Sequence, residues 1–287
     1  MFSVNMLMYG DNYPLASRCL GSLVNNADWS LISEVRIGLN DVCKDTDKYV
    51  REVCSRIIPP KVPTYVYRAE RHGKPVNALK YPLMGRMLHD EFLPVEAEYV
   101  MWFDDDSFIT SAPSWWSEVA SVMRSSDMLG HIYTIRQRGE QHIHIRKQAW
   151  FSNKDVNPRH TYRFATGGWW VIRREVLEEW NYPFPGLRHR GGDAMLGELM
   201  RQQEYRLKSW HEGVRINALD EKSGDSTSPR RGVDESWYLQ EGNDEESHLG
   251  HLDFDVDVWL PGRPSVEPSD STLLRLPGFR GEVSDEV

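Results

Sequence analysis

The first half of the chain alternates between short apolar runs and segments whose apolar residues recur every three or four positions. The apolar runs, which are typical of buried strands, cover residues 2–9, 35–39, 65–67 and 99–103. The segments with helical spacing cover residues 13–25, 49–57 and 75–89. Strands and helices in this alternating order predict an α/β fold with a mainly parallel, twisted sheet flanked by helices.

The second half is less regular. Its pattern predicts helices over residues 113–124 and 193–203, strands over 167–172 and 205–210, and a polar, basic hairpin over 129–137 and 143–151. Residues 220–247 are rich in Gly, Ser, Pro and acidic residues, which is typical of a long flexible loop. Residues 262–287 form an acidic tail with several prolines. We therefore expect one domain over residues 1–261.

Three adjacent acids, Asp104, Asp105 and Asp106 (the aspartate cluster), follow the apolar run at 99–103 directly. Like charges at such short spacing cost free energy unless a cation neutralises them. Carboxylate oxygens are hard ligands that suit Mg²⁺ or Mn²⁺, and such an ion can stabilise a departing diphosphate. In doubly wound sheets, ligands bind beyond the carboxyl ends of strands. The sequence thus predicts a metal and diphosphate site here, and the alternative is an acidic turn that caps a helix.

A second acidic position, Asp193, follows Gly191 and Gly192 and opens a segment with helical spacing. It could be an N-cap alone, or a general base that deprotonates an acceptor hydroxyl. Together with the aspartate cluster, it favours catalysis. Upstream, Gly168 would allow close approach of the backbone to a ligand, and Trp169 could stack on a sugar ring or fill the core.

Charge and cysteine content narrow the function classes. The net charge of −9 argues against a protein that coats nucleic acid generally. Residues 136–163 nevertheless carry seven Lys or Arg against two acids, a local balance of +5, which is either a basic binding face or ordinary solvated surface. Cys19, Cys43 and Cys54 are odd in number and lack metal-ligand spacing, so reduced thiols in the cytoplasm are expected. No apolar run is long enough to cross a bilayer, and the start lacks the charged region of a signal peptide.

These motifs, in this order, resemble the GT-A glycosyltransferases of the family-2 type over residues 2–260. The strongest parts are residues 8–23, the aspartate cluster, and Gly-Gly-Asp-Ala-Met-Leu-Gly-Glu-Leu at 191–199. The resemblance implies a GT-A-like fold and metal-dependent transfer of a sugar from a nucleotide sugar. For the donor nucleotide, it implies contacts from Tyr9, Gly10, Asp11, Asn40, Asp41, Asp104 and Asp105. For the metal, it implies Asp104, Asp106 and, as the histidine near the domain's end, His251; Asp193 matches the base of inverting members.

A narrower likeness concerns the acceptor. Lys-Tyr-Pro-Leu-Met at 80–84, the segment 101–107 and Ser-Pro-Arg-Arg-Gly at 228–232 look like a phage and bacterial group similar to the base J type of DNA glucosyltransferases. That group modifies hydroxymethylated pyrimidines. The likeness implies that Lys80, Arg86, Arg230 and Arg231 contact donor phosphates or the DNA backbone. The sequence departs from the usual pattern at Gly85, where a second basic residue is expected.

The predicted reaction is a metal-dependent, inverting transfer of a sugar from a UDP-sugar, with UDP-glucose as the expected donor. The expected acceptor is hydroxymethyluracil or hydroxymethylcytosine in phage DNA, in the cytoplasm of the host. One alternative is a saccharide or protein hydroxyl, as in the synthesis of surface polysaccharides. A retaining mechanism stays open if Asp193 only caps its helix. A nucleotide-binding protein without activity is a third hypothesis, which the retained aspartates disfavour.

Overall fold

The structure, a computed structural model, describes residues 1–10, 12–69, 80–133, 163–183, 192–216 and the backbone of 254–259. The strands are β1 (Phe2–Tyr9), β2 (Ile32–Asn40), β3 (Thr64–Ala69), β4 (Tyr99–Asp104), β5 (Ser107–Ile109), β6 (Met128–Ile132), β7 (Ala165–Arg173), β8 (Leu207–Ser209), β9 (Val214–Ile216) and β10 (Phe254–Trp259). The helices are α1 (Tyr13–Asn26), α2 (Lys44–Arg56), α3 (Lys80–Leu88), α4 (Ser114–Met123), α7 (Arg174–Trp180) and α8 (Gly192–Gln202).

One sheet holds eight of these strands, in the order β10-β3-β2-β1-β4-β7-β6-β8. The strands β3, β2, β1 and β4 are parallel neighbours, and β6 pairs with β8 in the same sense. The remaining neighbours, β10 with β3 and β7 with both β4 and β6, are antiparallel. The predicted α/β class with a mainly parallel sheet is confirmed. The antiparallel direction of β7 was not predicted.

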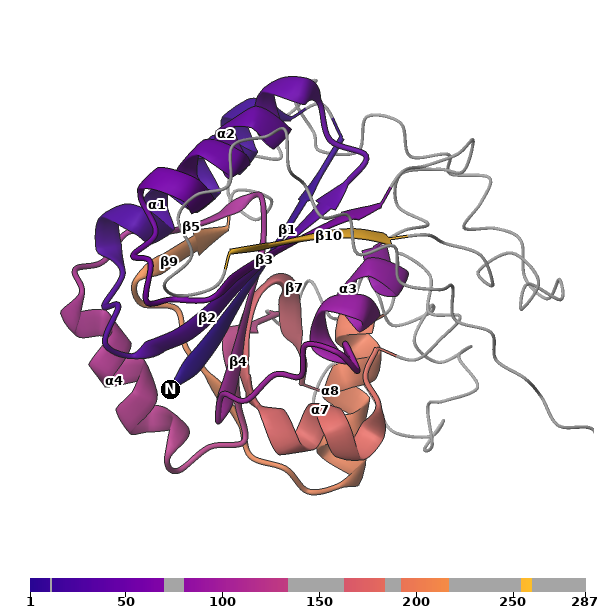
Figure 1. Ribbon diagram of the computed structural model, residues 1–287. Helices are drawn as coiled ribbons and strands as arrows, with labels where there is room; N and C mark the ends of the chain where they lie inside the picture. Colours follow the sequence, from indigo (N-terminus) through magenta and orange to yellow (C-terminus); the bar gives the residue numbers. More distant parts are fainter. Residues whose placement is uncertain (11, 70–79, 134–162, 184–191, 217–253, 260–287) are drawn as a thin grey trace, which may run out of the picture.

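Helices cover both faces of the sheet (Figure 1). On one face, α1, α2 and α4 bury Leu20, Val53 and Trp116 in one apolar cluster. On the other face, α3, α7 and α8 contribute to a second cluster. Successive strand residues enter opposite clusters: Phe103 packs in the first and Trp102 in the second. A strand buried on both faces has a continuous apolar run, and that pattern identified β4 in the sequence.

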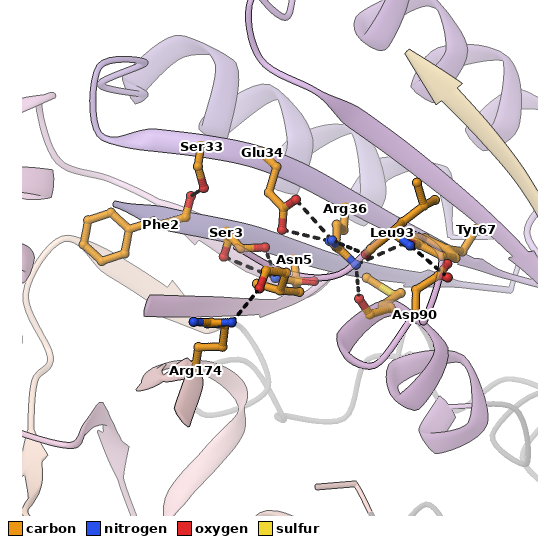
Figure 2. Close-up of polar contacts among 12 residues, drawn as sticks. Phe2, Ser3, Asn5, Ser33, Glu34, Arg36, Tyr67, Asp90, Leu93 and Arg174 are labelled. Atoms are coloured by element: carbon orange, nitrogen blue, oxygen red, sulfur yellow. Dashed lines mark hydrogen bonds and ion pairs between the residues drawn. The ribbon is translucent and has the colours of Figure 1, made fainter. Parts of the chain in front are cut away.

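A buried arginine fixes the position of α3 (Figure 2). The Arg36 guanidinium, in β2, is fully buried and forms a two-pronged ion pair with Glu34 through bonds of 2.9 and 3.1 Å. It also donates to the carbonyl oxygen of Met87 at 2.6 Å and to that of Leu93 at 2.7 Å. Its remaining N–H group reaches the Tyr67 hydroxyl at 3.3 Å. Because Met87 lies near the end of α3, this network ties that helix to the sheet, and α3 carries Lys80 at its start.

Local pattern located most elements to within a few residues but missed four. The small sheet of β5 and β9, the helix α7 and the strand β10 were not predicted. β6 is shorter than the predicted strand 129–137, and its neighbours are β7 and β8. The predicted strand 143–151, the loop 220–247 and the tail 262–287 lie outside the described residues. No helix within the described ranges is long and apolar enough to span a membrane.

Candidate active site at the carboxyl edge of the sheet

The predicted site residues gather at one edge of the sheet. The carboxyl ends of β1, β2, β4 and β6 point to this edge, and the antiparallel strand β7 begins there. The strand register places Tyr9 beside Asn40, Leu7 beside Asp104 and Phe103 beside Trp169. Residues far apart in the sequence therefore meet where a doubly wound sheet binds its ligands.

The loops after β1 and β2 are joined by backbone hydrogen bonds. The Gly10 amide donates to the carbonyl oxygen of Asn40 at 3.1 Å, and the Cys43 amide donates to that of Gly10 at 3.1 Å. Gly10 and Asp41 both adopt left-handed backbone conformations, with φ of 65° and 49°. A glycine adopts this conformation without strain. The structure thus brings Tyr9, Gly10, Asn40 and Asp41 together, whereas Asp11 lies outside the described residues.

Asp105 links the aspartate cluster to the loop after β1. Its side chain is buried, and one carboxylate oxygen accepts a hydrogen bond of 3.3 Å from the Tyr9 amide. The other oxygen has no hydrogen-bond partner within the described part of the chain. Burial raises the pKa of Asp105 well above its ordinary value, and the neighbouring charges of Asp106 and Asp104 raise it further. A buried carboxyl group with an unused oxygen is costly, which is typical of a binding site.

Asp104 is held by two donors. One of its oxygens accepts a 2.6 Å hydrogen bond from the Lys80 ammonium, and the other accepts a 3.0 Å bond from the indole nitrogen of Trp102. Burial alone would lower the pKa of Lys80, but the charge of Asp104 and the hydrogen bond to it raise the pKa overall. The Lys80 ammonium is therefore a fixed positive charge at the edge of the aspartate cluster.

Asp106 completes the cluster. Burial, and then the charge of Asp104, raise its pKa to about 6, against the opposing influence of Lys80 and a hydrogen bond from Ser107. Three carboxyl groups thus face two cations, Lys80 and Arg18, which leaves negative charge that a divalent cation would neutralise. Oxygen donors of this kind suit Mn²⁺ or Mg²⁺, so the residues present fit such an ion in their chemistry.

The described ranges contain no group of three His, Cys, Asp or Glu side chains arranged to hold a metal ion. His251, the predicted third ligand, lies outside these ranges, as do Arg230 and Arg231. The metal ligands therefore stay a prediction.

Asp193 lies in the first turn of α8. It accepts a 2.9 Å hydrogen bond from the Ala194 amide, and the Tyr133 hydroxyl lies near the same carboxylate. Burial raises its pKa, while the Ala194 amide, the charge of Lys80 and the Tyr133 hydroxyl oppose that shift. Lys80 senses the charges of both Asp104 and Asp193, so this ammonium connects the cluster electrostatically with the predicted base.

Three of the predicted contact residues make packing or local contacts in the structure: Gly168, Trp169 and Arg86. A Cβ on Gly168 would come within 2.8 Å of Ile216, and the Gly168 carbonyl accepts a 2.7 Å bond from the Ser107 hydroxyl. Trp169 is fully buried against Trp115, so its ring has no exposed face for a sugar. Trp170, also buried, stacks on Trp102 at an interplanar angle of 11°.

Arg86 pairs with the buried Asp90 at 3.6 Å, near the end of α3. This contact lies on the helix that Arg36 anchors. The structure gives Arg86 a local ion pair, and its predicted contact with a phosphate stays a prediction.

Two residues near the site escaped the sequence analysis. Tyr133, one residue after β6, has its hydroxyl near Asp193. Arg18, in α1, holds its guanidinium 4.4 Å from the centre of the Phe108 ring, and its charge lowers the pKa of Asp106. Arg18 lies within the family-like segment 8–23, which was a usable signal. Tyr133 had none, because only the pairing of β6 with β7 brings its position to this edge.

Comparison with known proteins gives distant structural likeness only. No protein-family model and no curated protein matches the sequence. A mannosyltransferase, PcManGT from Pyrobaculum calidifontis in complex with GDP-Man and Mn²⁺, is similar at 18% identity and a TM-score of 0.46, over 73% of this chain and 55% of that one. S. aureus TarS 1–349 in complex with UDP-GlcNAc is similar at 15% identity and a TM-score of 0.44, over 75% of this chain and 60% of that one. This chain thus covers less than two thirds of these neighbours.

Proposed function

We propose that this protein is a metal-dependent glycosyltransferase that uses a nucleotide sugar. The observation that carries the proposal is the Asp105 bridge: one carboxyl group of the aspartate cluster holds the amide of Tyr9, in the loop expected to bind the nucleoside. Transfer from a nucleoside diphosphate requires a cation beside the nucleotide. The Asp105 bridge joins the carboxylates that would bind the cation to the loop that would bind the nucleoside. The order of motifs along the sequence supports the same conclusion independently.

Asp104 and Asp106 would hold Mn²⁺ or Mg²⁺, with His251 as the expected third ligand. When bound, the ion supplies positive charge that stabilises a nucleoside diphosphate as leaving group. Tyr9, Gly10, Asp11, Asn40 and Asp41 bind the nucleoside in this proposal. The Lys80 ammonium, already paired with Asp104 at 2.6 Å, lies where it can also bind a donor phosphate.

Asp193 acts as the base. It accepts the proton of the acceptor hydroxyl while the acceptor oxygen forms a bond to the anomeric carbon of the sugar and the bond from that carbon to the donor phosphate breaks. A single displacement of this kind inverts the anomeric configuration. Its position in the same electrostatic environment as Lys80 and Asp104 supports this role. UDP-glucose is the donor that we propose, on the resemblance given by the sequence.

For the acceptor, we propose a hydroxymethylated pyrimidine base in DNA. The basic stretch 136–163, whose described member Arg163 is exposed, would contact backbone phosphates, and Arg230 and Arg231 would add to these contacts. A saccharide or protein hydroxyl is the alternative. Salt separates the two, because binding to DNA weakens steeply as the salt concentration rises, whereas binding to a neutral saccharide responds little.

The test is incubation with Mn²⁺, a panel of nucleotide sugars and DNA that contains hydroxymethyluracil or hydroxymethylcytosine, followed by digestion and mass analysis of the nucleosides. The expected result is a gain of one hexose mass on one modified nucleoside. The Asp104→Asn variant should lose this product, and Asp45→Asn, a change at an exposed aspartate, should keep it. Release of the nucleoside diphosphate without a change in the DNA would contradict the DNA acceptor, and no release with any donor would contradict glycosyl transfer.

A further inference from the structure

Tyr133 lies where β6 ends at the carboxyl edge of the sheet. Its backbone amide donates a 3.2 Å hydrogen bond to the carbonyl oxygen of Phe164, just before β7. Its ring packs on the Phe164 ring, with centroids 4.8 Å apart and the planes tilted by 47°. The hydroxyl group, at the far end of this supported ring, lies close enough to the Asp193 carboxylate that each group shifts the pKa of the other.

The helix that carries Asp193 is fixed against the same segment. A Cβ on Gly197 would come within 2.2 Å of Phe164 and 2.6 Å of the Arg163 carbonyl oxygen, so α8 packs directly on the backbone there. At the start of the helix, a Cβ on Gly192 would meet the Tyr81 hydroxyl. Asp193 is thus held between α3 on one side and the end of β6 on the other.

Several charged or titratable groups surround Asp193. Lys80 and Tyr81 come from α3, Asp104 from the end of β4, Tyr182 from the segment after α7, and Tyr133 from the end of β6. Two of these groups favour the ionised form of Asp193: Lys80 through its charge, and Tyr133 through its hydrogen bond. Burial opposes ionisation. Lys80 is already engaged with Asp104, which leaves the Tyr133 hydroxyl as the side-chain donor placed beside the carboxylate.

We infer that Tyr133 is a positioning residue for the base: its hydroxyl donates to the Asp193 carboxylate and directs the other carboxylate lone pairs toward the acceptor hydroxyl. The inference rests on the proposed function, because it needs Asp193 to accept a proton. It adds a residue from the half of the sheet in which the sequence showed no site motif. A donor on an ionised carboxylate also keeps that carboxylate available at lower pH.

The test is the pH dependence of kcat/KM for Tyr133→Phe, measured as diphosphate release from the nucleotide sugar with acceptor present. The substitution keeps the ring on Phe164 and removes only the hydroxyl. Without its donor, Asp193 binds a proton more readily, so the acidic limb of the profile should move to higher pH. At the optimum, kcat should fall about fivefold and KM for the donor should change less than about twofold, since the lost contact is to the base.

Tyr205→Phe is the matched control, because the Tyr205 hydroxyl also donates to a carboxylate, that of Glu179, at 2.7 Å. It should leave the profile unchanged. In an Asp193→Asn background, Tyr133→Phe should cause little further loss, because both changes act on one group. If Tyr133→Phe fails to fold, Phe164→Leu, which removes the ring support and keeps the hydroxyl, should move the acidic limb in the same direction.

Four outcomes decide the matter. A displaced acidic limb in Tyr133→Phe with no effect of Tyr205→Phe supports the inference. A Tyr133→Phe profile that superimposes on the wild-type profile overturns it. So does a loss in the Asp193→Asn background as large as the loss in the wild type. A wild-type chain that releases no diphosphate from any nucleotide sugar overturns the proposed function, and the role of Tyr133 with it.

Discussion

Two regions of the molecule bury charge, and they do so in opposite ways. Around Arg36, each N–H of the guanidinium has a partner, and the charge is balanced by Glu34 (Figure 2). In the aspartate cluster, three carboxyl groups face the two cations Lys80 and Arg18, and Asp105 keeps an oxygen without a partner among the described residues. A balanced, fully bonded charge serves the fold, whereas an unbalanced one is retained at a cost in stability. The contrast distinguishes a structural ion pair from a binding site.

The largest expected effect is on the balanced region. Arg36→Met should lower the free energy of unfolding by about 3–5 kcal/mol, because it leaves Glu34 buried without its partner. Denaturant unfolding followed by circular dichroism measures this change. The double variant with Glu34→Gln should recover part of the loss. A loss below about 1 kcal/mol in Arg36→Met would show that this network does not anchor the fold.

Near the aspartate cluster, removal of the Asp193 carboxylate should lower the catalytic rate and leave the stability of the fold unchanged. Asp193→Asn should lower kcat about 10²- to 10⁴-fold while the protein binds the nucleoside diphosphate as tightly as the wild type. Steady-state kinetics and titration calorimetry give the two quantities. Full activity in this variant, with normal diphosphate binding, would rule out the base and leave Asp193 as a residue that only stabilises its helix.

A smaller effect, of opposite sign on stability, should follow from Asp106. Its pKa is raised from 3.8 to about 6 in the folded protein, so the native state binds a proton that the unfolded chain has released. This contribution to stability is present below pH 3.8 and is lost as the pH rises through 6. With a chelator present, Asp106→Asn should therefore be more stable than the wild type by about 1–2 kcal/mol at pH 7.

This stability difference should disappear at the acidic end of the same range. Unfolding curves at several pH values test the prediction, with exposed Asp45→Asn as the control that keeps the wild-type pH dependence. An Asp106→Asn variant less stable than the wild type at pH 7 would mean that the cluster is not strained by its charge.

The smallest effect is expected at an ordinary surface pair. Arg56 bonds Glu52 at 3.3 Å on the exposed side of α2. Arg56→Met should change the free energy of unfolding by less than about 0.5 kcal/mol, since exposed pairs gain little. Measured beside Arg36→Met, it separates the effect of burial from the effect of losing an arginine. Equal losses in the two variants would remove that distinction.

Sequence pattern predicted the half of the fold in which local signals suffice. A continuous apolar run gave β4, and a mainly apolar run gave β1. Helical spacing gave α1 and α8, because a helix buried along one stripe repeats its apolar residues every three or four positions. The antiparallel insertion of β7 between β4 and β6 left no such trace. Strand order depends on pairing between distant segments, and local periodicity does not record it.

The candidate site divides in the same way. The aspartate cluster was predicted at a strand's end, and the structure places it there beside Lys80. Trp169 was a candidate for sugar stacking, but its ring faces the core, and residue type alone does not reveal which face of a strand a side chain occupies. The contact of Tyr133 with Asp193 was beyond prediction, because it joins a strand end to a helix start sixty residues later through tertiary packing alone.

The position of the Asp105 carboxyl group affects how tightly the cation and the nucleotide bind. One of its oxygens holds the Tyr9 amide, and its own charge depends on the neighbouring aspartates. A cation bound to the carboxylates would favour the ionised form of Asp105. The ionised carboxylate would accept a stronger hydrogen bond from that amide, and this bond would order the nucleoside loop. By linkage, the nucleotide would tighten the hold on the cation by the same factor. The two ligands would then bind with positive cooperativity, through a single side chain that both of them influence.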